Sequence, residues 1–201
     1  MTDMKEKIEL LDANQLAAVE NLRDAAFSPQ EGLPEELFLL ISGLVPLPNV
    51  DMLITNEKNE LLLRRRVDSW FQNSWHIPGG CMHYGEEFLT CVHKTALREL
   101  GTDVFVKPDP IAVRNVIRGV DPTKRYPRER GHNVAILFAC TVPEGWYPEN
   151  GSKNEMDNGY MKWFDTLPTD FMTIQDVYAD VLLPWTKEKG RRENEGECMD
   201  C

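Results

Sequence analysis

The sequence predicts an α/β protein in which a central mixed sheet lies between helices as an α/β/α sandwich, with a helical extension at the N-terminus. Short apolar segments separated by polar turns recur between residues 50 and 164, a pattern typical of strands. One of these segments ends in a glycine pair, and the loop after it leads to the most amphipathic helix, residues 86–100. A separate helical stripe of apolar residues precedes the first strand.

Residues 1–32 form the predicted extension. Leucine, valine and alanine recur at helical spacing between residues 10 and 26, and a Ser-Pro pair ends the helix. A second helix is expected over residues 35–42, where a glycine and then a proline stop it. Packing of these helices against the body and contact between two copies of the chain, a homodimer, are the two interpretations.

The predicted domain covers residues 33–187. Its strands are expected at residues 50–55, 60–66, 75–78, 104–106, 111–117, 133–142 and 160–164. A closing helix is expected over residues 177–187, and the charged segment 188–201 is predicted to be a disordered tail. We find no internal repeat and no low-complexity linker.

Composition restricts the function. The formal net charge of −11 disfavours nucleic acid and anionic membranes as partners, because both carry negative charge. The first ten residues do not resemble a signal peptide, and five sparse cysteines favour a reducing, cytoplasmic setting. The terminal pair Cys198 and Cys201 is interpreted as part of the solvated tail.

Residues 76–101 contain the candidate chemistry. A strand ends in Gly79 and Gly80, where glycine permits close approach of the backbone to a ligand or ion. Glu86 opens the predicted helix, and Thr95 and Glu99 share one helix face by their spacing. A carboxylate near a backbone carbonyl favours a hard cation such as magnesium. The alternative is an ordinary capped surface helix.

This segment resembles the Nudix box, a catalytic motif built on one glycine, a loop and a carboxylate-rich helix. Four positions match the motif in register: Gly80, Glu86, Glu99 and Gly101. Lys94 stands for the arginine of the motif, and Thr95 and Arg98 stand where the family has glutamates. The resemblance implies a Nudix fold with fewer metal-binding carboxylates.

The degenerate box is similar to that of the GDP-mannose mannosyl hydrolase branch, with a likeness from about Glu36 to about Trp163. On this resemblance, Asp51 and Arg66 fall on substrate-site residues of that branch. It implies a nucleoside-diphosphate sugar as substrate and hydrolysis at the sugar C1–O bond. It also implies magnesium, or manganese in its place, on the Glu99 carboxylate and the Gly79 carbonyl.

The general-base histidine of that branch has no counterpart here, because no histidine follows His132. Counting back from the loop tryptophan places Asn158 at the base position and Asp157 at a metal ligand. Glu155 and Asp157 are the loop carboxylates able to accept a proton, so we predict Glu155 as base and Asp157 as metal ligand. Glu86 completes the predicted catalytic acids.

A basic loop is the predicted phosphate clamp, because arginine matches phosphate oxygens with two hydrogen bonds. Its members, with a neighbouring histidine as a further substrate contact, are Arg118, Arg125, Arg128, Arg130 and His132. The alternative is a solvated loop that balances an acidic surface. The clamp would replace the charge of an arginine that follows the paired glycines in the related branch and is Cys81 here.

Three functions follow as hypotheses. The first is a magnesium-dependent hydrolase of a nucleoside-diphosphate sugar that cleaves the sugar C1–O bond. The second is a Nudix pyrophosphatase that cleaves phosphorus–oxygen bonds with Glu86, Glu99 and Asp157 as acids. The third is a nucleotide-sugar sensor that has kept the fold and lost turnover.

Overall fold

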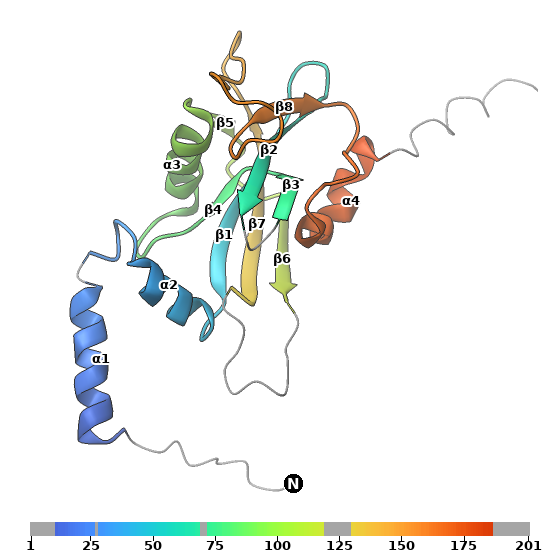
Figure 1. Cartoon of the computed structure of the whole chain (residues 1–201). Coiled ribbons are helices and arrows are strands. Elements are labelled where there is room, and N and C mark those ends of the chain that lie inside the picture. Colours follow the sequence, from blue (N-terminus) through green and yellow to red (C-terminus); the bar gives the residue numbers. More distant parts are fainter. Residues whose placement is uncertain (1–10, 27, 69–71, 119–129, 187–201) are drawn as a thin grey trace, which may run out of the picture.

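A computed structural model describes residues 11–26, 28–68, 72–118 and 130–186, and it confirms the predicted α/β/α architecture (Figure 1). The helices are α1 (Ala13–Ala25), α2 (Glu35–Ser42), α3 (Phe88–Leu100) and α4 (Ala179–Leu182), with 3₁₀ segments η1 (Thr173–Tyr178) and η2 (Leu183–Trp185). The strands are β1 (Leu47–Ile54), β2 (Leu61–Asp68), β3 (Gln72–His76), β4 (Gly79–Cys81), β5 (Phe105–Val106), β6 (Ala112–Ile117), β7 (His132–Thr141) and β8 (Met161–Phe164).

The strands form two sheets, one of which is mixed. In the larger sheet the order is β4-β1-β7-β5, and β6 also pairs with β7. Strands β1 and β7 run parallel, whereas β4 is antiparallel to β1. The smaller sheet has the order β3-β2-β8 and is antiparallel. Because β4 follows β3 after two residues, the chain passes directly from the smaller sheet to the larger one.

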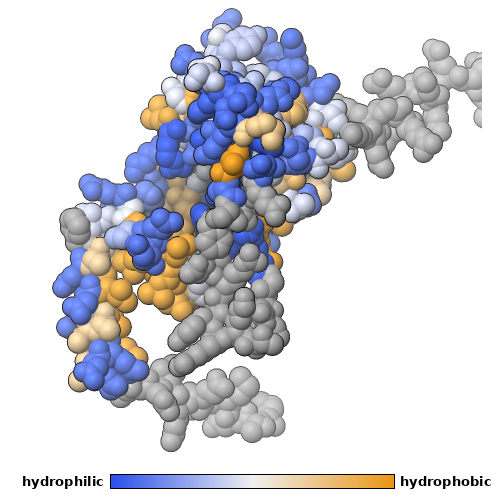
Figure 2. All heavy atoms as spheres, in the orientation of Figure 1, coloured by the Kyte–Doolittle hydropathy of each residue, from blue (hydrophilic) through white to orange (hydrophobic). Residues whose placement is uncertain are grey.

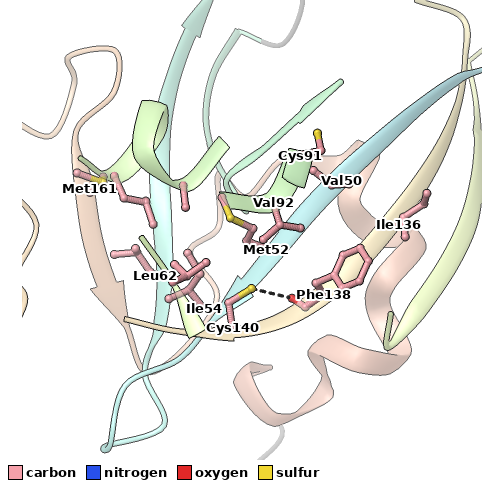
Figure 3. Packing of buried hydrophobic residues seen from close by; sticks show 13 residues of the cluster. Val50, Met52, Ile54, Leu62, Cys91, Val92, Ile136, Phe138, Cys140 and Met161 are labelled. Atoms are coloured by element: carbon pink, nitrogen blue, oxygen red, sulfur yellow. Dashed lines mark hydrogen bonds between the residues drawn. The ribbon is translucent and has the colours of Figure 1, made fainter. Parts of the chain in front are cut away.

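Two apolar clusters hold the layers together. One lies between the larger sheet and α3 and includes Met52, Val92 and Phe138, all fully buried (Figure 3). The other joins both sheets to the C-terminal helices and includes Leu63, Ile77 and Tyr178. Burial of large apolar side chains on both faces explains why strands and helices alternate as layers.

The ends of two helices differ from the sequence prediction. Helix α3 begins at Phe88 rather than at Glu86, because Glu86 accepts a hydrogen bond from the His83 amide within the preceding loop. Phe88, the first residue of the helix, is 46% exposed. The prediction of one closing helix is wrong. Helix α4 ends at Leu182 and is followed by the 3₁₀ segment η2, because Pro184 has no amide hydrogen to continue the helical hydrogen bonds.

Packing against the body, one of the two interpretations of both helices, is confirmed for α2, which buries Leu37 and Ser42, and is wrong for α1. Helix α1 begins with a capping box between Asp12 and Gln15, and none of its residues is buried. Leu16, Val19 and Leu22 are 40–52% exposed on it. Figure 1 shows α1 reaching away from the sheets, and Figure 2 shows apolar surface gathered over α1 and α2. In the described ranges no helix has the length and apolarity needed to cross a membrane.

Candidate functional site

A cleft opens between the larger sheet and the C-terminal η1 segment. It is open to solvent and encloses about 630 Å³, the solvent space at its mouth included. Its polar lining comes from five strands and from η1: Asn49, Asp51, Arg66, His76, Cys81, Asn133, Gln175 and Tyr178, with Arg130 from the segment before β7. The cleft therefore combines cations, a carboxyl group and an imidazole.

Asp51 lies on β1 and is 6% exposed. The Tyr178 hydroxyl donates to its Oδ2 at 2.7 Å, and the Asn49 amide donates to its Oδ1 at 2.9 Å. Burial raises the pKa of Asp51 to about 7, although the two hydrogen bonds lower it in part. A carboxyl group that titrates near neutrality is suited to proton transfer.

The neutral imidazole of His76 also lines the cleft. Its Nδ1 faces the carbonyl oxygen of Ile77 at 2.9 Å, so Nδ1 carries the proton and Nε2 is left as an acceptor. That Nε2 is buried and has no hydrogen-bond partner within the described residues. Burial, followed by the charges of Arg66 and Arg64, lowers the pKa of His76 to about 3. His76 is therefore an uncharged acceptor beside the two arginines.

Arg130 reaches the cleft from the segment before β7. Its amide donates to the Ser42 hydroxyl at 2.8 Å, and its guanidinium lies 5.2 Å from the ring centroid of Phe38. Burial raises the pKa of the neighbouring Cys81 thiol, while Arg130 lowers it in part. The thiol thus stays protonated, and the guanidinium remains the charged group on this side of the cleft.

Gln175 fixes η1 beside the cleft. Its side chain accepts from the Ile77 amide at 2.8 Å and donates to the Ile77 carbonyl at 3.1 Å. This paired contact continues the hydrogen bonding of β3 onto a side chain from the C-terminal segment. It places Tyr178, the last residue of η1, against Asp51.

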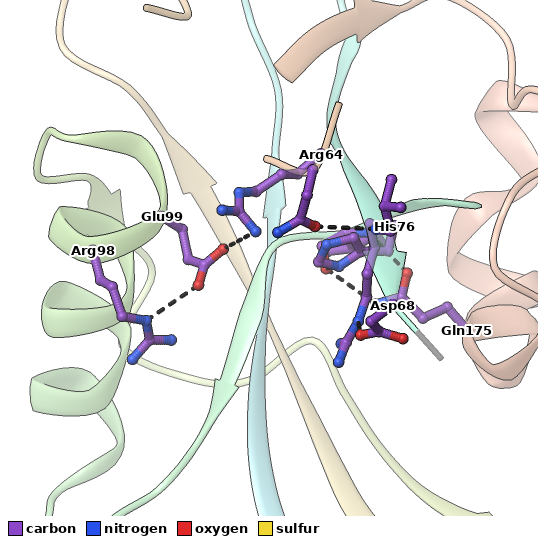
Figure 4. A network of polar contacts seen from close by, with 10 residues as sticks. Arg64, Asp68, His76, Arg98, Glu99 and Gln175 are labelled. Carbon is purple, nitrogen blue, oxygen red and sulfur yellow. Dashed lines mark hydrogen bonds and ion pairs between the residues drawn. The ribbon is translucent and has the colours of Figure 1, made fainter. Parts of the chain in front are cut away.

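Glu99 lies on the other side of β4 and is held by two arginines (Figure 4). Arg64 on β2 contacts Oε2 at 2.7 Å, and Arg98 contacts Oε1 at 3.1 Å. Both oxygens of the carboxylate are therefore engaged by guanidinium groups. Thr95, one turn earlier on α3, is buried and offers no charge.

These residues do not fit the magnesium site that the Nudix resemblance implies. Thr95 and Arg98 replace two carboxylates, and the remaining carboxylate of Glu99 is neutralised by arginines. The described residues contain no group of three or more histidine, cysteine, aspartate or glutamate side chains that could hold a metal ion. A hard cation needs several oxygen ligands with net negative charge, and here it would meet two guanidinium groups.

Glu86 has a structural partner of its own. Its carboxylate is 5% exposed, contacts Lys94 at 3.0 Å and accepts from the His83 amide at 3.0 Å. Burial alone raises the pKa of Glu86, but these two contacts outweigh it and hold the pKa below its ordinary value. Glu86 therefore ties the loop before α3 to the helix, and its predicted catalytic role stays a prediction.

The loop before β8 places its acids outside the cleft lining. Glu155 is exposed and contacts Lys162 at 2.5 Å. The Asp157 Oδ2 accepts from the amide and the side chain of Asn154, both at 2.8 Å. Asn158, the residue at the position of the absent histidine, accepts from the Val67 amide at 3.0 Å. The roles of Glu155 as base and Asp157 as ligand stay predictions.

The other predicted site residues divide into three groups. Asp51, Arg66 and Arg130 lie together in the cleft, and their roles as substrate contacts stay predictions. Arg118 and His132 lie at the facing ends of β6 and β7 and do not line it. Arg125 and Arg128 lie outside the described residues, as do the tail 188–201 and its cysteine pair.

Sequence reasoning missed His76, Tyr178 and the pairing of Arg64 with Glu99. One feature of the sequence could have indicated His76 as a site residue, because it lies on a predicted strand three positions before the glycine pair. Tyr178 has none, because it meets Asp51 across 127 residues of chain. The side chain that reaches Glu99 can be identified only after β2 is placed beside α3.

Comparison with known proteins assigns the chain to a family. A family model of the NUDIX domain matches residues 45–181, more than half of the chain. The protein therefore belongs to the Nudix family, which supports its assignment as a Nudix hydrolase.

One curated relative is a "low-salt glycan biosynthesis protein", Agl8 of Haloferax volcanii, with 31% identity over 85 residues, 42% of this chain. The chain spans about half of that protein's length, 54%. A MutT Nudix hydrolase from Burkholderia pseudomallei is similar in structure, with 19% identity, coverage of 68% of this chain and 98% of that one, and a TM-score of 0.50. A UDP-X diphosphatase has 19% identity, 86% coverage of both chains and a TM-score of 0.44. The structural likenesses concern the fold alone.

Proposed function

We propose that this protein hydrolyses a nucleoside-diphosphate sugar at the sugar C1–O bond, releasing a nucleoside diphosphate and the free sugar. One observation carries the proposal: Asp51, with a pKa near 7, lies at the foot of a cleft that also presents Arg66 and Arg130. The arginines suit a diphosphate, and the carboxyl group suits the transfer of a proton from water.

Cleavage at carbon is favoured over cleavage at phosphorus by the charges around α3. Attack of water on a phosphoryl group in this family relies on several carboxylates that hold metal ions, and Thr95 and Arg98 stand at two of those positions. Cleavage at C1 requires that the departing diphosphate be stabilised, which cations can do directly. The arginines beside the cleft therefore support C–O cleavage.

The residues of the cleft have distinct roles in this reaction. Asp51, oriented by Tyr178 and Asn49, accepts the proton of the attacking water. Arg66 and Arg130 bind the diphosphate, and the Nε2 of His76 accepts a hydrogen bond from a sugar or phosphate hydroxyl. Glu155 is the competing base on the loop before β8.

Hydrolysis of a panel of nucleoside-diphosphate sugars in water labelled with oxygen-18 tests the proposal. Cleavage at C1 places the label in the free sugar, and cleavage at phosphorus places it in a phosphate. We expect labelled sugar and an unlabelled nucleoside diphosphate by mass spectrometry. Label in the phosphate product would support the pyrophosphatase hypothesis, and tight binding of a nucleotide sugar without turnover would support the sensor.

We further propose that α1 and α2 mediate a homodimer. The proposal is supported by the exposed apolar side chains of α1, because Leu16, Val19 and Leu22 are not buried within the described chain and would gain burial in a dimer. Replacing Leu16 and Leu22 with aspartate should convert a dimer to a monomer in light-scattering measurements at micromolar concentration. Asn21→Asp, on the opposite side of the helix, is the matched control. A wild-type protein that is monomeric at this concentration would contradict the proposal.

A further inference from the structure

We propose that Arg64, Arg98 and Lys153 form an anion site that binds a diphosphate without a divalent cation, at the place where the family's carboxylates would hold a metal. In the proposed function the substrate's diphosphate lies in the cleft on Arg66 and Arg130, so this site is a second anion site. The anion site itself rests on the contacts around Glu99.

The three cations lie beside two glycines, Arg98 at Gly80 and the other two at Gly159. A Cβ atom at position 80 would lie 2.5 Å from the Arg98 Nη2, so the guanidinium of Arg98 lies directly over Gly80 in β4. A Cβ atom at position 159 would lie 2.8 Å from the Arg64 Nη2 and 3.1 Å from the Lys153 Nζ. The Arg64 and Lys153 groups thus face the same point, and Glu99 lies between the two guanidinium groups (Figure 4).

The charges of this cluster do not balance. Arg64 and Arg98 both contact the carboxylate of Glu99, Lys153 faces the same point as Arg64, and Thr95, the neighbouring position of the box, is uncharged. The Nε of Arg64 is buried without a hydrogen-bond partner among the described residues. A buried guanidinium donor that is left unsatisfied is costly, and an anion would satisfy it.

The cluster adjoins strands that also border the cleft. Arg64 pairs with His76 across β2 and β3, and its charge contributes to the lowered pKa of that histidine. Gly79 adjoins Asp51 in the cleft, whereas the next residue, Gly80, adjoins Thr95 and Arg98. Because successive residues of a strand face opposite sides, the cluster lies across β4 from Asp51 and the cleft.

Two binding measurements on the wild-type protein test the proposal without any turnover. We expect inorganic pyrophosphate to bind in the presence of EDTA by calorimetry. We also expect no binding of Mn²⁺ at micromolar concentration by electron paramagnetic resonance. Absence of pyrophosphate binding in EDTA, or stoichiometric binding of Mn²⁺ at this concentration, would overturn the proposal. Failure of the proposed function would appear instead as intact pyrophosphate binding with no hydrolysis of any nucleotide sugar.

Glu99→Gln separates the anion site from a metal site, because the two predict opposite results. Loss of the only carboxylate in the cluster should leave pyrophosphate binding in EDTA unchanged or tighter. Arg98→Gln should weaken it roughly tenfold to hundredfold, since a charge-assisted hydrogen bond is lost. Arg98 is 53% exposed, so this variant is expected to fold, and Arg23→Gln on α1 is the control. Weakened binding in Glu99→Gln would overturn the proposal.

The double substitution Thr95→Glu and Arg98→Glu restores the acidic residues of the box around Glu99. We expect it to gain binding of Mn²⁺ at micromolar concentration and to lose pyrophosphate binding in EDTA. Circular dichroism checks that the variant is folded, because Thr95 is buried. A folded variant that still binds pyrophosphate in EDTA as the wild-type protein does would overturn the proposal.

Discussion

Asp51→Asn should lower kcat by about a hundred- to ten-thousand-fold, the usual effect of removing a positioned general base. The wild-type enzyme should gain kcat/KM as pH rises toward 7, because burial raises the pKa of Asp51 to about 7 and the ionised form is the base. The substitution removes this rise. Glu155→Gln, on the loop that carries the competing base, is the matched comparison. Full kcat in Asp51→Asn with loss in Glu155→Gln would move the base to the loop.

The same ionisation predicts a pH dependence of stability. The pKa of Asp51 is raised from 3.8 to about 7 in the folded protein, so the folded state keeps a proton that the unfolded state has lost. The free energy of unfolding should therefore fall, relative to Asp51→Asn, as pH rises from about 4 to about 7, by a few kcal/mol. It should be constant above pH 7. Chemical denaturation at several pH values measures this, with Asp109→Asn as the control outside the cleft.

The sequence predicts well the features that depend on local chemistry. Helix α2 has the predicted bounds, Glu35–Ser42, because a glycine follows it directly. Helix α3 ends as predicted at Gly101, whose φ of 72° is the left-handed conformation that glycine adopts readily. The seven predicted strands lie within a few residues of their positions, since their apolar residues are those that the two clusters bury. The sequence does not predict strand β4, because its two glycines indicate a turn.

The charges of the site depend on contacts that no local pattern contains. Glu99 and Arg98 are neighbours in the sequence, but the partner that completes the cluster, Arg64, comes from a strand of the other sheet. Spacing along α3 predicts Glu99 on the side of the glycine pair and cannot say which sign of charge meets it. For the same reason the burial of Asp51, and hence its raised pKa, became visible only with η1 in place.

Gly79 is the position at which the fold and the site depend most closely on one another. A Cβ atom there would lie 2.2 Å from the Asp51 Oδ1 and 2.6 Å from the Val50 carbonyl oxygen. Neither contact can be relieved by a flexible side chain, because Asp51 is fixed by Tyr178 and the carbonyl belongs to β1. The absence of a side chain at this position is what allows β4 to approach β1 beside the carboxyl group of Asp51.

Gly79→Ala should therefore lower the free energy of unfolding by about 1–3 kcal/mol or more, as overpacking does when the backbone must move. It should also lower kcat, because Asp51 is displaced from Tyr178. Denaturant unfolding and steady-state kinetics measure the two effects.

Gly80→Ala is the matched control: the nearest atom to its Cβ, at 2.5 Å, is the end of the Arg98 side chain, which can move. The substitution Asp51→Ala should restore part of the stability lost in Gly79→Ala and none of the activity, since it removes one of the two close contacts and leaves the Val50 carbonyl. Equal losses of stability in Gly79→Ala and Gly80→Ala would show that the approach of β4 to Asp51 is not the constraint.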